Sequence, residues 1–190
     1  MSRSKLASSL LLAMWVAAPA AYPEAVDAIT GPKAANVDAK RLLAAGDDEA
    51  NWLSYGRTYD EQRFSPLTAI NDKNIGKLGL QWSADMDTAR GQEATPIVVD
   101  GVLYISTAWS MVKAFDAATG KLLWSYDPEV PREKLVDVCC DAVNRGVAVY
   151  NGKVFVGTDY GNIFCVDVKD RSADGWAMWG GNAAHNGWEE

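Results

Sequence analysis

The sequence predicts an all-β protein, a β-propeller of which about two blades are present together with an N-terminal arm. The first observation is a pair of β-rich runs joined by Asp100-Gly101, the pattern of a tight two-residue hairpin. The second is the return of this pattern 51 residues later, around Asn151-Gly152. The third is an aspartate that follows each hairpin at the same spacing, Asp116 and Asp167. An internal repeat of four short strands at this period is typical of propeller blades.

The first copy of the repeat predicts four consecutive strands. Two of them flank the Asp100-Gly101 turn within residues 96–107. A third spans Val112–Phe115, and a fourth spans Lys121–Trp124 after a turn that begins at Asp116. The strand-forming residues are mostly Val, Ile, Leu and aromatics, which favour strands.

The second copy follows the first for three strands and then diverges. Its hairpin spans residues 147–158, and Cys165–Asp167 falls where the third strand of the first copy ends. Beyond it, Asp170–Gly175 replaces Thr119–Trp124, and Trp176 comes one place late. Two unrelated hairpins are the alternative, but they leave the shared aspartate and its spacing unexplained.

The N-terminus has the pattern of a secretory signal peptide. Arg3 and Lys5 precede an apolar run, which ends in the small-residue site Ala18-Pro19-Ala20. The run is shorter than the roughly 20 residues of a membrane-spanning helix. A short buried helix is the alternative. We expect export to the periplasm, an oxidising compartment in which disulfides persist.

The segment after the leader reads as a linker and then an arm. Val37–Ala45 has the apolar spacing of a helix, which Gly46 would end, and Leu78–Trp82 reads as a strand. The formal net charge is −7, which argues against nucleic acid or anionic membrane surfaces as partners. We expect four parts: a signal peptide (1–20), a linker with a short helix (21–50), a partial propeller (51–168) and an atypical tail (169–190).

Adjacent cysteines, Cys139 and Cys140, stand out among the three cysteines of the chain. A disulfide between neighbours closes a strained ring, since their Cα atoms are only about 3.8 Å apart. It also closes almost no loop, so it stabilises little and instead suggests a rigid surface for a ligand. Two unpaired buried cysteines are the alternative. Cys165 is then the odd one, either buried and free or lacking its partner.

The number of residues in the chain limits how many propeller blades it can form. A blade takes about 40–50 residues and a closed propeller needs at least four blades. Two blades leave sheet edges and an apolar face uncovered. The sequence therefore predicts the N-terminal part of a larger protein.

Three groups of residues together carry a family resemblance. They are Trp52-x-x-Tyr55-Gly with Arg63-x-Ser-Pro-Leu67; Ala114-Phe-Asp-Ala-Ala-Thr-Gly-Lys-Leu-Leu-Trp124; and Gln92-Glu93-Ala-Thr-Pro96 with Cys139-Cys140 and Asn144-Arg145-Gly146. Over residues 35–167 the chain resembles the pyrroloquinoline-quinone (PQQ)-dependent alcohol dehydrogenases, which are eight-bladed quinoprotein propellers. Cofactor-free propellers share the second group, whereas the adjacent cysteines with Asn-Arg-Gly are specific.

The resemblance implies that Cys139 and Cys140 form a disulfide ring against one face of the quinone. It implies that Glu93 and Arg145 bind the polar rim of PQQ, where a cation stabilises charge on oxygen. Arginine offers a planar fork of donors for that role. Without the cysteines, a surface acid and an ordinary ion pair would be the simpler interpretation of Glu93 and Arg145.

Other functional groups of the family do not match this sequence. The resemblance places the Ca²⁺ ligands, the catalytic aspartate base and the tryptophan on the other quinone face in later blades, so no catalytic or metal-binding residue is expected here. Asp167 belongs to the blade repeat, and His185 is interpreted as a solvated loop residue. Asp141 and Asn144 flank the ring without an assigned role. Packing is the interpretation of two residues assigned to strands, Trp109 and Thr158.

The function implied by the resemblance is that of a periplasmic oxidoreductase for small alcohols. Ca²⁺ would polarise the quinone, an aspartate would take the alcohol proton, and hydride would pass to the quinone to give an aldehyde. Electrons would leave to a cytochrome c-type acceptor, and this chain alone would be inactive. The alternatives are a non-enzymatic propeller scaffold of the outer-membrane assembly type and a quinoprotein acting on sugars or polyols.

Overall fold

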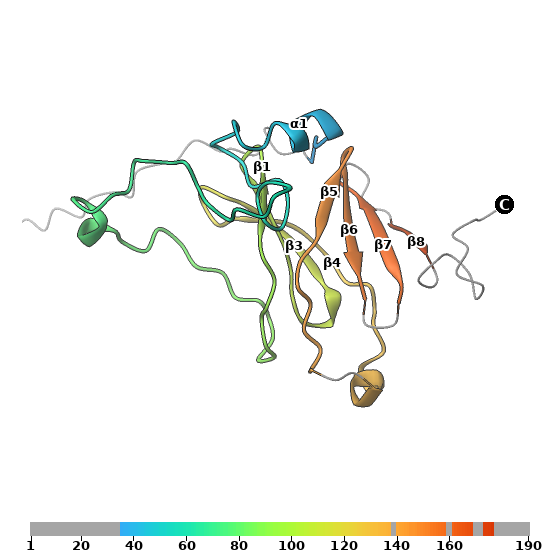
Figure 1. Cartoon of the computed structure of the whole chain (residues 1–190). Helices are drawn as coiled ribbons and strands as arrows, with labels where there is room; N and C mark the ends of the chain where they lie inside the picture. The colour runs from blue at the N-terminus through green and yellow to red at the C-terminus, as the bar shows by residue number, and fades with distance from the viewer. Residues whose placement is uncertain (1–34, 138–139, 159–160, 169–172, 177–190) are drawn as a thin grey trace, which may run out of the picture.

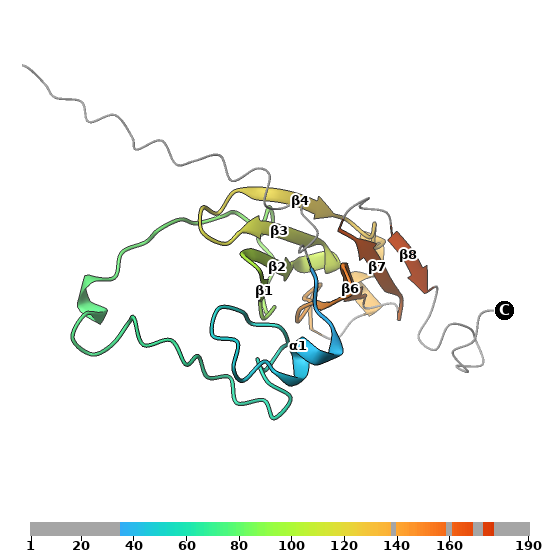
Figure 2. The ribbon, with the colours of Figure 1, turned by 90° about the horizontal axis from the view of Figure 1, so that it is seen from above.

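The structure, a computed structural model, describes residues 35–137, 140–158, 161–168 and 173–176 of the 190-residue chain. It contains two four-stranded antiparallel sheets that lie side by side, β1-β2-β3-β4 and β5-β6-β7-β8 (Figures 1 and 2). The strands are β1 Ile97–Val99, β2 Val102–Ser106, β3 Val112–Asp116, β4 Leu122–Tyr126, β5 Ala148–Tyr150, β6 Lys153–Gly157, β7 Ile163–Asp167 and β8 Ala173–Trp176. The predicted all-β class is confirmed. The predicted signal peptide, Cys139 and His185 lie outside the described residues.

Both predicted hairpin turns are present. Asp100 and Gly101 have φ of 48° and 85°, and Asn151 and Gly152 have φ of 47° and 77°. Positive φ at both central residues is the geometry of a type I′ turn, which matches the twist of the flanking strands. Asp, Asn and Gly are the residues that adopt it at least cost, so the local sequence determines these turns.

The 51-residue repeat is also a structural repeat. In the first sheet Val102 pairs with Asp116, and in the second sheet Lys153 pairs with Asp167 at the equivalent place. A backbone hydrogen bond closes each third strand onto its hairpin, from Ala117 N to the Gly101 carbonyl (2.8 Å) and from Val168 N to the Gly152 carbonyl (3.1 Å). The two copies therefore fold alike through their first three strands.

The fourth strands differ. In the first sheet Trp124 of β4 lies opposite Ala114, whereas in the second sheet Asp174 of β8 lies opposite Cys165. The expected limit of the propeller at residue 168 falls inside the second sheet, because β8 is still part of it. Strand pairing thus persists after the sequence repeat has faded.

The core joins the two sheets to residues of the N-terminal arm. Tyr104 and Trp124 pack at 6.0 Å between ring centroids within the first sheet. Tyr126 and Phe164 pack at the same distance and connect the two sheets. The cluster consists of Ala35, Val37, Ala45, Leu53, Ile97, Val99, Val102, Tyr104, Val112, Ala114, Trp124, Val149, Val154 and Val156. Removing this apolar surface from water is the main stabilising term.

The arm begins with a strap, residues 35–41, that crosses both hairpin turns. The carbonyls of Ala35 and Val37 accept hydrogen bonds from Gly152 N (2.9 Å) and Asn151 N (2.8 Å). The predicted helix is shorter than expected, α1 Ala39–Leu43, and Asp38 caps it by accepting from Arg41 N at 2.7 Å. Arg41 then donates to both Asp100 carboxylate oxygens, at 2.9 and 3.0 Å.

The predicted strand at 78–82 does not form. Past the short 3₁₀ turn η1 (Ile75–Lys77), this part of the arm runs as an irregular loop out from the sheets (Figure 1). Trp82 anchors it, through a bond from Nε1 to the Ala117 carbonyl at 3.1 Å and stacking on Phe115. A strand needs a partner for its backbone groups, and the described residues provide none here.

Candidate functional site

The site forms where the two sheets meet, at the segments that lead into β1 and β5. These lead-in segments are residues 93–96 and residues 141–147. A parallel bridge joins them, Thr95 to Gly146, with Thr95 N donating to the Arg145 carbonyl at 3.3 Å. Gly146 has a φ of 138°, and a Cβ there would lie 3.2 Å from the Thr95 carbonyl oxygen. Glycine is therefore required for this close approach of the two backbones.

The bridge brings two of the predicted site residues together. Arg145 Nη2 lies 3.1 Å from Glu93 Oε2, and the two side chains remain 68% and 44% exposed. Such exposure means that the pair contributes little to stability, since surface ion pairs are worth about 0–1 kcal/mol. It also leaves guanidinium N–H groups available to an anionic ligand. The pair therefore presents exposed donors and acceptors that a polar ligand could bind.

The cysteines are described only in part. Cys140 is exposed and disulfide-bonded, and Cys139 lies outside the described residues. The pairing of the two with each other stays a prediction. Cys165 is half-buried on β7, where it lies opposite Phe155.

Asn144, to which the sequence assigned no role, is a central residue of the site. Its Oδ1 accepts from Ser106 Oγ (2.6 Å) and from Gly146 N (3.1 Å). Its Nδ2 donates to Ser110 Oγ (3.0 Å) and to the Gly157 carbonyl (2.7 Å). These bonds tie the β5 lead-in segment to both sheets. An Asn followed two residues later by Gly is a turn signal that sequence reasoning missed.

Trp109 was predicted to lie in a strand and does not. It occupies η2 (Ala108–Ser110) with a φ of 64°, a conformation that bulky residues rarely adopt. Its backbone N–H donates to the Ala142 carbonyl at 2.8 Å. The guanidinium carbons of Arg132 and Arg90 lie 4.3 and 5.9 Å from its ring centroid, in the range of cation–π contacts.

Arg90 also holds the start of the β5 lead-in segment, through an ion pair with Asp141 at 2.8 Å. Asp141 therefore has a structural role that the sequence did not reveal.

Thr158, like Trp109, was predicted to lie in a strand and does not. It follows β6, and its backbone N–H donates to the Asn162 carbonyl at 2.9 Å.

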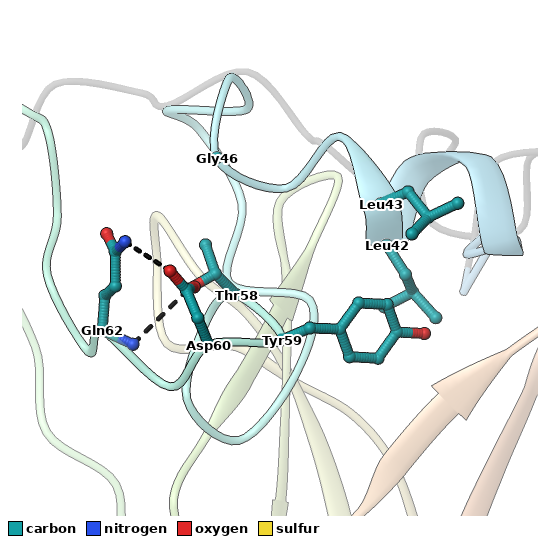
Figure 3. A pocket seen from close by; sticks show the side chains of 7 residues that line it. All are labelled: Leu42, Leu43, Gly46, Thr58, Tyr59, Asp60 and Gln62. Atoms are coloured by element: carbon teal, nitrogen blue, oxygen red, sulfur yellow. Dashed lines mark hydrogen bonds between the residues drawn. The ribbon is translucent and has the colours of Figure 1, made fainter.

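A separate pocket lies on the arm. It has a volume of about 360 Å³ and is lined by Leu42, Leu43, Gly46, Thr58, Tyr59, Asp60 and Gln62 (Figure 3). Hydrogen bonds from Thr58 and then Gln62 lower the pKa of the exposed Asp60 carboxyl. The pocket is lined by none of the predicted site residues and is therefore separate from the site.

Among the described residues, no group of three or more His, Cys, Asp or Glu side chains could hold a metal ion. None of the helices among those residues is long and apolar enough to cross a membrane.

Comparisons with known proteins match this chain to a family. Residues 52–173 match the family described as "PQQ: Glucose/ethanol/alcohol dehydrogenase, beta-propeller domain". The dehydrogenase subunit of "Alcohol dehydrogenase (quinone)" from Komagataeibacter europaeus is 58% identical over 128 residues, which are 67% of this chain and 17% of that protein. The "1-butanol dehydrogenase (cytochrome c)" of Thauera butanivorans is 52% identical over 127 residues, 67% of this chain and 18% of that protein.

The fold comparison agrees. The structure of the quinohemoprotein alcohol dehydrogenase ADHIIG from Pseudomonas putida HK5 matches with a TM-score of 0.71 and 54% identity, over 73% of this chain and 20% of that one. The described sheets are thus two blades of a propeller, as the repeat predicted. The chain spans about a fifth of the length of these relatives.

Proposed function

The chain belongs to the PQQ-dependent glucose/ethanol/alcohol dehydrogenase β-propeller family, and on that premise we propose that it forms one wall of the PQQ pocket of an alcohol-oxidising enzyme. The observation that carries the proposal is the exposed Glu93–Arg145 pair at the junction of two blades. Glu93 lies two residues before Thr95, and Arg145 lies next to Gly146, so each is close to one end of the Thr95–Gly146 bridge. Both side chains are therefore held on the same surface by backbone contacts.

The residues present fit the cofactor. PQQ is a flat tricarboxylate, and the Arg145 side chain is mostly exposed, so its guanidinium can donate to a carboxylate or quinone oxygen. Glu93 orients that guanidinium and offers a second oxygen to a ligand N–H. We propose that Cys139 and Cys140 pair as a disulfide beside them and provide the flat surface. When bound, PQQ supplies the acceptor for the hydride of the alcohol, and the protein positions it.

The remaining parts of the function are proposals from the resemblance. A Ca²⁺ ion and an aspartate base would come from parts of the longer protein outside this chain. A cytochrome c-type protein is the proposed electron acceptor, as the name of the Thauera relative says for that enzyme. The predicted signal peptide at residues 1–20 supports a periplasmic location. The names of the relatives favour alcohols over sugars or polyols, and they do not favour a scaffold.

The test is a PQQ titration of the full-length protein prepared without cofactor. Binding is measured by the quenching of the protein's tryptophan fluorescence. We expect Arg145→Ala to weaken PQQ binding about 10- to 100-fold, because a charge-assisted hydrogen bond is lost. Cys139→Ser/Cys140→Ser should also weaken it. The matched control is Arg63→Ala, since Arg63 is another exposed arginine paired with a glutamate at 3.1 Å. Equal affinities of the Arg145 and Arg63 variants would refute this site.

A further inference from the structure

The Asn144 side chain uses every hydrogen bond that an amide can make. An amide has two N–H donors and two acceptor positions on its oxygen. In Asn144 the oxygen accepts from Ser106 and Gly146, and the nitrogen donates to Ser110 and Gly157. All four distances lie between 2.6 and 3.1 Å. No other side chain of this size has two donors and two acceptors, so the network specifies Asn.

The four partners come from separate parts of the fold. Ser106 ends β2 and Ser110 ends η2, both in the first blade, and they are 0% and 1% exposed. Gly157 ends β6 in the second blade. A buried hydroxyl that loses its partner costs free energy, because water does not replace the bond. Asn144 thus connects two blades through groups that depend on it.

The same amide fixes the backbone around Arg145. The bond from Gly146 N to Asn144 Oδ1 closes a turn with Arg145 at its centre. The Arg145 carbonyl is held in addition by Thr95 N at 3.3 Å. The peptide group that follows Arg145 is therefore held at both its N–H and its carbonyl, and the residue before Arg145 is held by the bonds of its own side chain. The Arg145 side chain thus leaves the backbone in a defined direction toward Glu93.

We propose that Asn144 is a positioning residue for the cofactor: it couples the packing of the two blades to the placement of Arg145. The inference rests on the proposed PQQ site and assigns a cause to its geometry. Asn144 itself reaches the ligand only through Arg145. Replacing Asn144 should leave the Arg145 guanidinium chemically unchanged but no longer held in one position. PQQ binding should then weaken, because the guanidinium must be ordered when the ligand binds.

Three variants of the full-length protein without cofactor test this proposal. Asn144→Ala removes all four bonds, and Asn144→Asp keeps the two acceptor positions while losing both donors. The control, Val154→Ala, truncates a fully buried β6 side chain and leaves the Asn144 bonds intact. Two measurements are made on each: the rate of tryptic cleavage after Arg145 relative to other sites, and PQQ affinity.

We expect Asn144→Ala to accelerate cleavage after Arg145 selectively, because the turn opens locally. We expect its PQQ affinity to fall about tenfold or more below that of Val154→Ala. Asn144→Asp should lie between wild type and Asn144→Ala in both measurements. If Asn144→Ala does not fold, the comparison of Asn144→Asp with Val154→Ala tests the proposal instead.

The inference is overturned if cleavage after Arg145 rises no more than at other sites, or if affinity falls no further than in the Val154 variant. Absence of PQQ binding by the wild type would refute the proposed function instead. The cleavage pattern would then still show whether Asn144 holds the Arg145 turn.

Discussion

The two blades share a backbone and differ in how side chains secure it. In the first blade the hairpin turn is held by side chains, since Asn51 Oδ1 accepts from Asp100 N at 2.7 Å and Arg41 donates to both carboxylate oxygens of Asp100. In the second blade the turn at Asn151-Gly152 is held by main-chain carbonyls of the strap. The comparison shows that the repeat conserves hydrogen-bonding positions, whereas the groups that occupy them vary.

The two blades also differ in the side chains that they contribute to the core. Tyr104 and Trp124 form an aromatic pair in the first blade, and both are almost fully buried. At the equivalent places the second blade has Phe155, which is half-buried, and Asp174. The second blade instead contacts the first through Phe164, against Tyr126. Among the described residues, the first blade therefore contributes more of the core than the second.

The largest expected effect breaks the core of the first blade. Trp124→Ala should lower the free energy of unfolding by about 3–5 kcal/mol, because a large buried ring leaves a cavity. Phe164→Ala, in the half-buried contact between blades, should cost clearly less. Urea denaturation of both variants measures the difference. Similar losses would show that the two blades share the core evenly.

A smaller effect is expected at the turn of the first blade. Arg41→Met should cost about 1–2 kcal/mol, because two charge-assisted bonds in a partly buried pair are lost. Hydrogen bonding to Asp100 raises the pKa of Arg41, consistent with that pairing. Arg63→Met removes an exposed ion pair instead and should leave the free energy of unfolding almost unchanged. Equal effects in the same denaturation assay would contradict a special role for the Arg41–Asp100 pair.

The smallest effect appears only at alkaline pH. Burial raises the pKa of the Tyr104 phenol, whereas the equivalent residue of the second blade is a phenylalanine. Below the ordinary tyrosine pKa of about 10, the phenol is protonated in both the folded and the unfolded chain. Above it only the unfolded chain releases the proton, so stability falls as the pH rises.

Tyr104→Phe should therefore reduce the loss of stability between about pH 9 and pH 11. Burial also raises the pKa of Tyr126, so part of the loss should persist. Denaturation at several pH values measures the slope, with the exposed Tyr150→Phe as control. The interpretation is wrong if the two variants have the same slope.

Local features were the ones that the sequence could predict. The Asp-Gly and Asn-Gly turns are determined by neighbouring residues, and the repeat then placed the strands around them. Glu93 and Arg145 were named from a resemblance, and the structure brings them into contact. By contrast, Leu78–Trp82 alternates like a strand, but strand formation depends on a partner that no local pattern reveals.

The unpredicted part of the site depends on residues that are far apart in the sequence. Asn144 acquires its role from Ser106 and Ser110, 38 and 34 residues away. Trp109 lies in the connection between β2 and β3, where its N–H donates to Ala142, 33 residues further along the chain. A sequence lists these residues without showing which of them meet, so neither role could be read from it.

The strap also sets an order of folding. Each hairpin closes over two residues, while Arg41 and Asp100 are separated by 59 and Val37 must meet Asn151 still further along. Closing longer loops costs more chain entropy, so the hairpins should form before the strap docks. The strap is made before either hairpin, and it has no complete binding surface until the second hairpin exists. A segment that precedes both hairpins in the chain is thus placed after them, and its docking reports that both hairpin turns have formed.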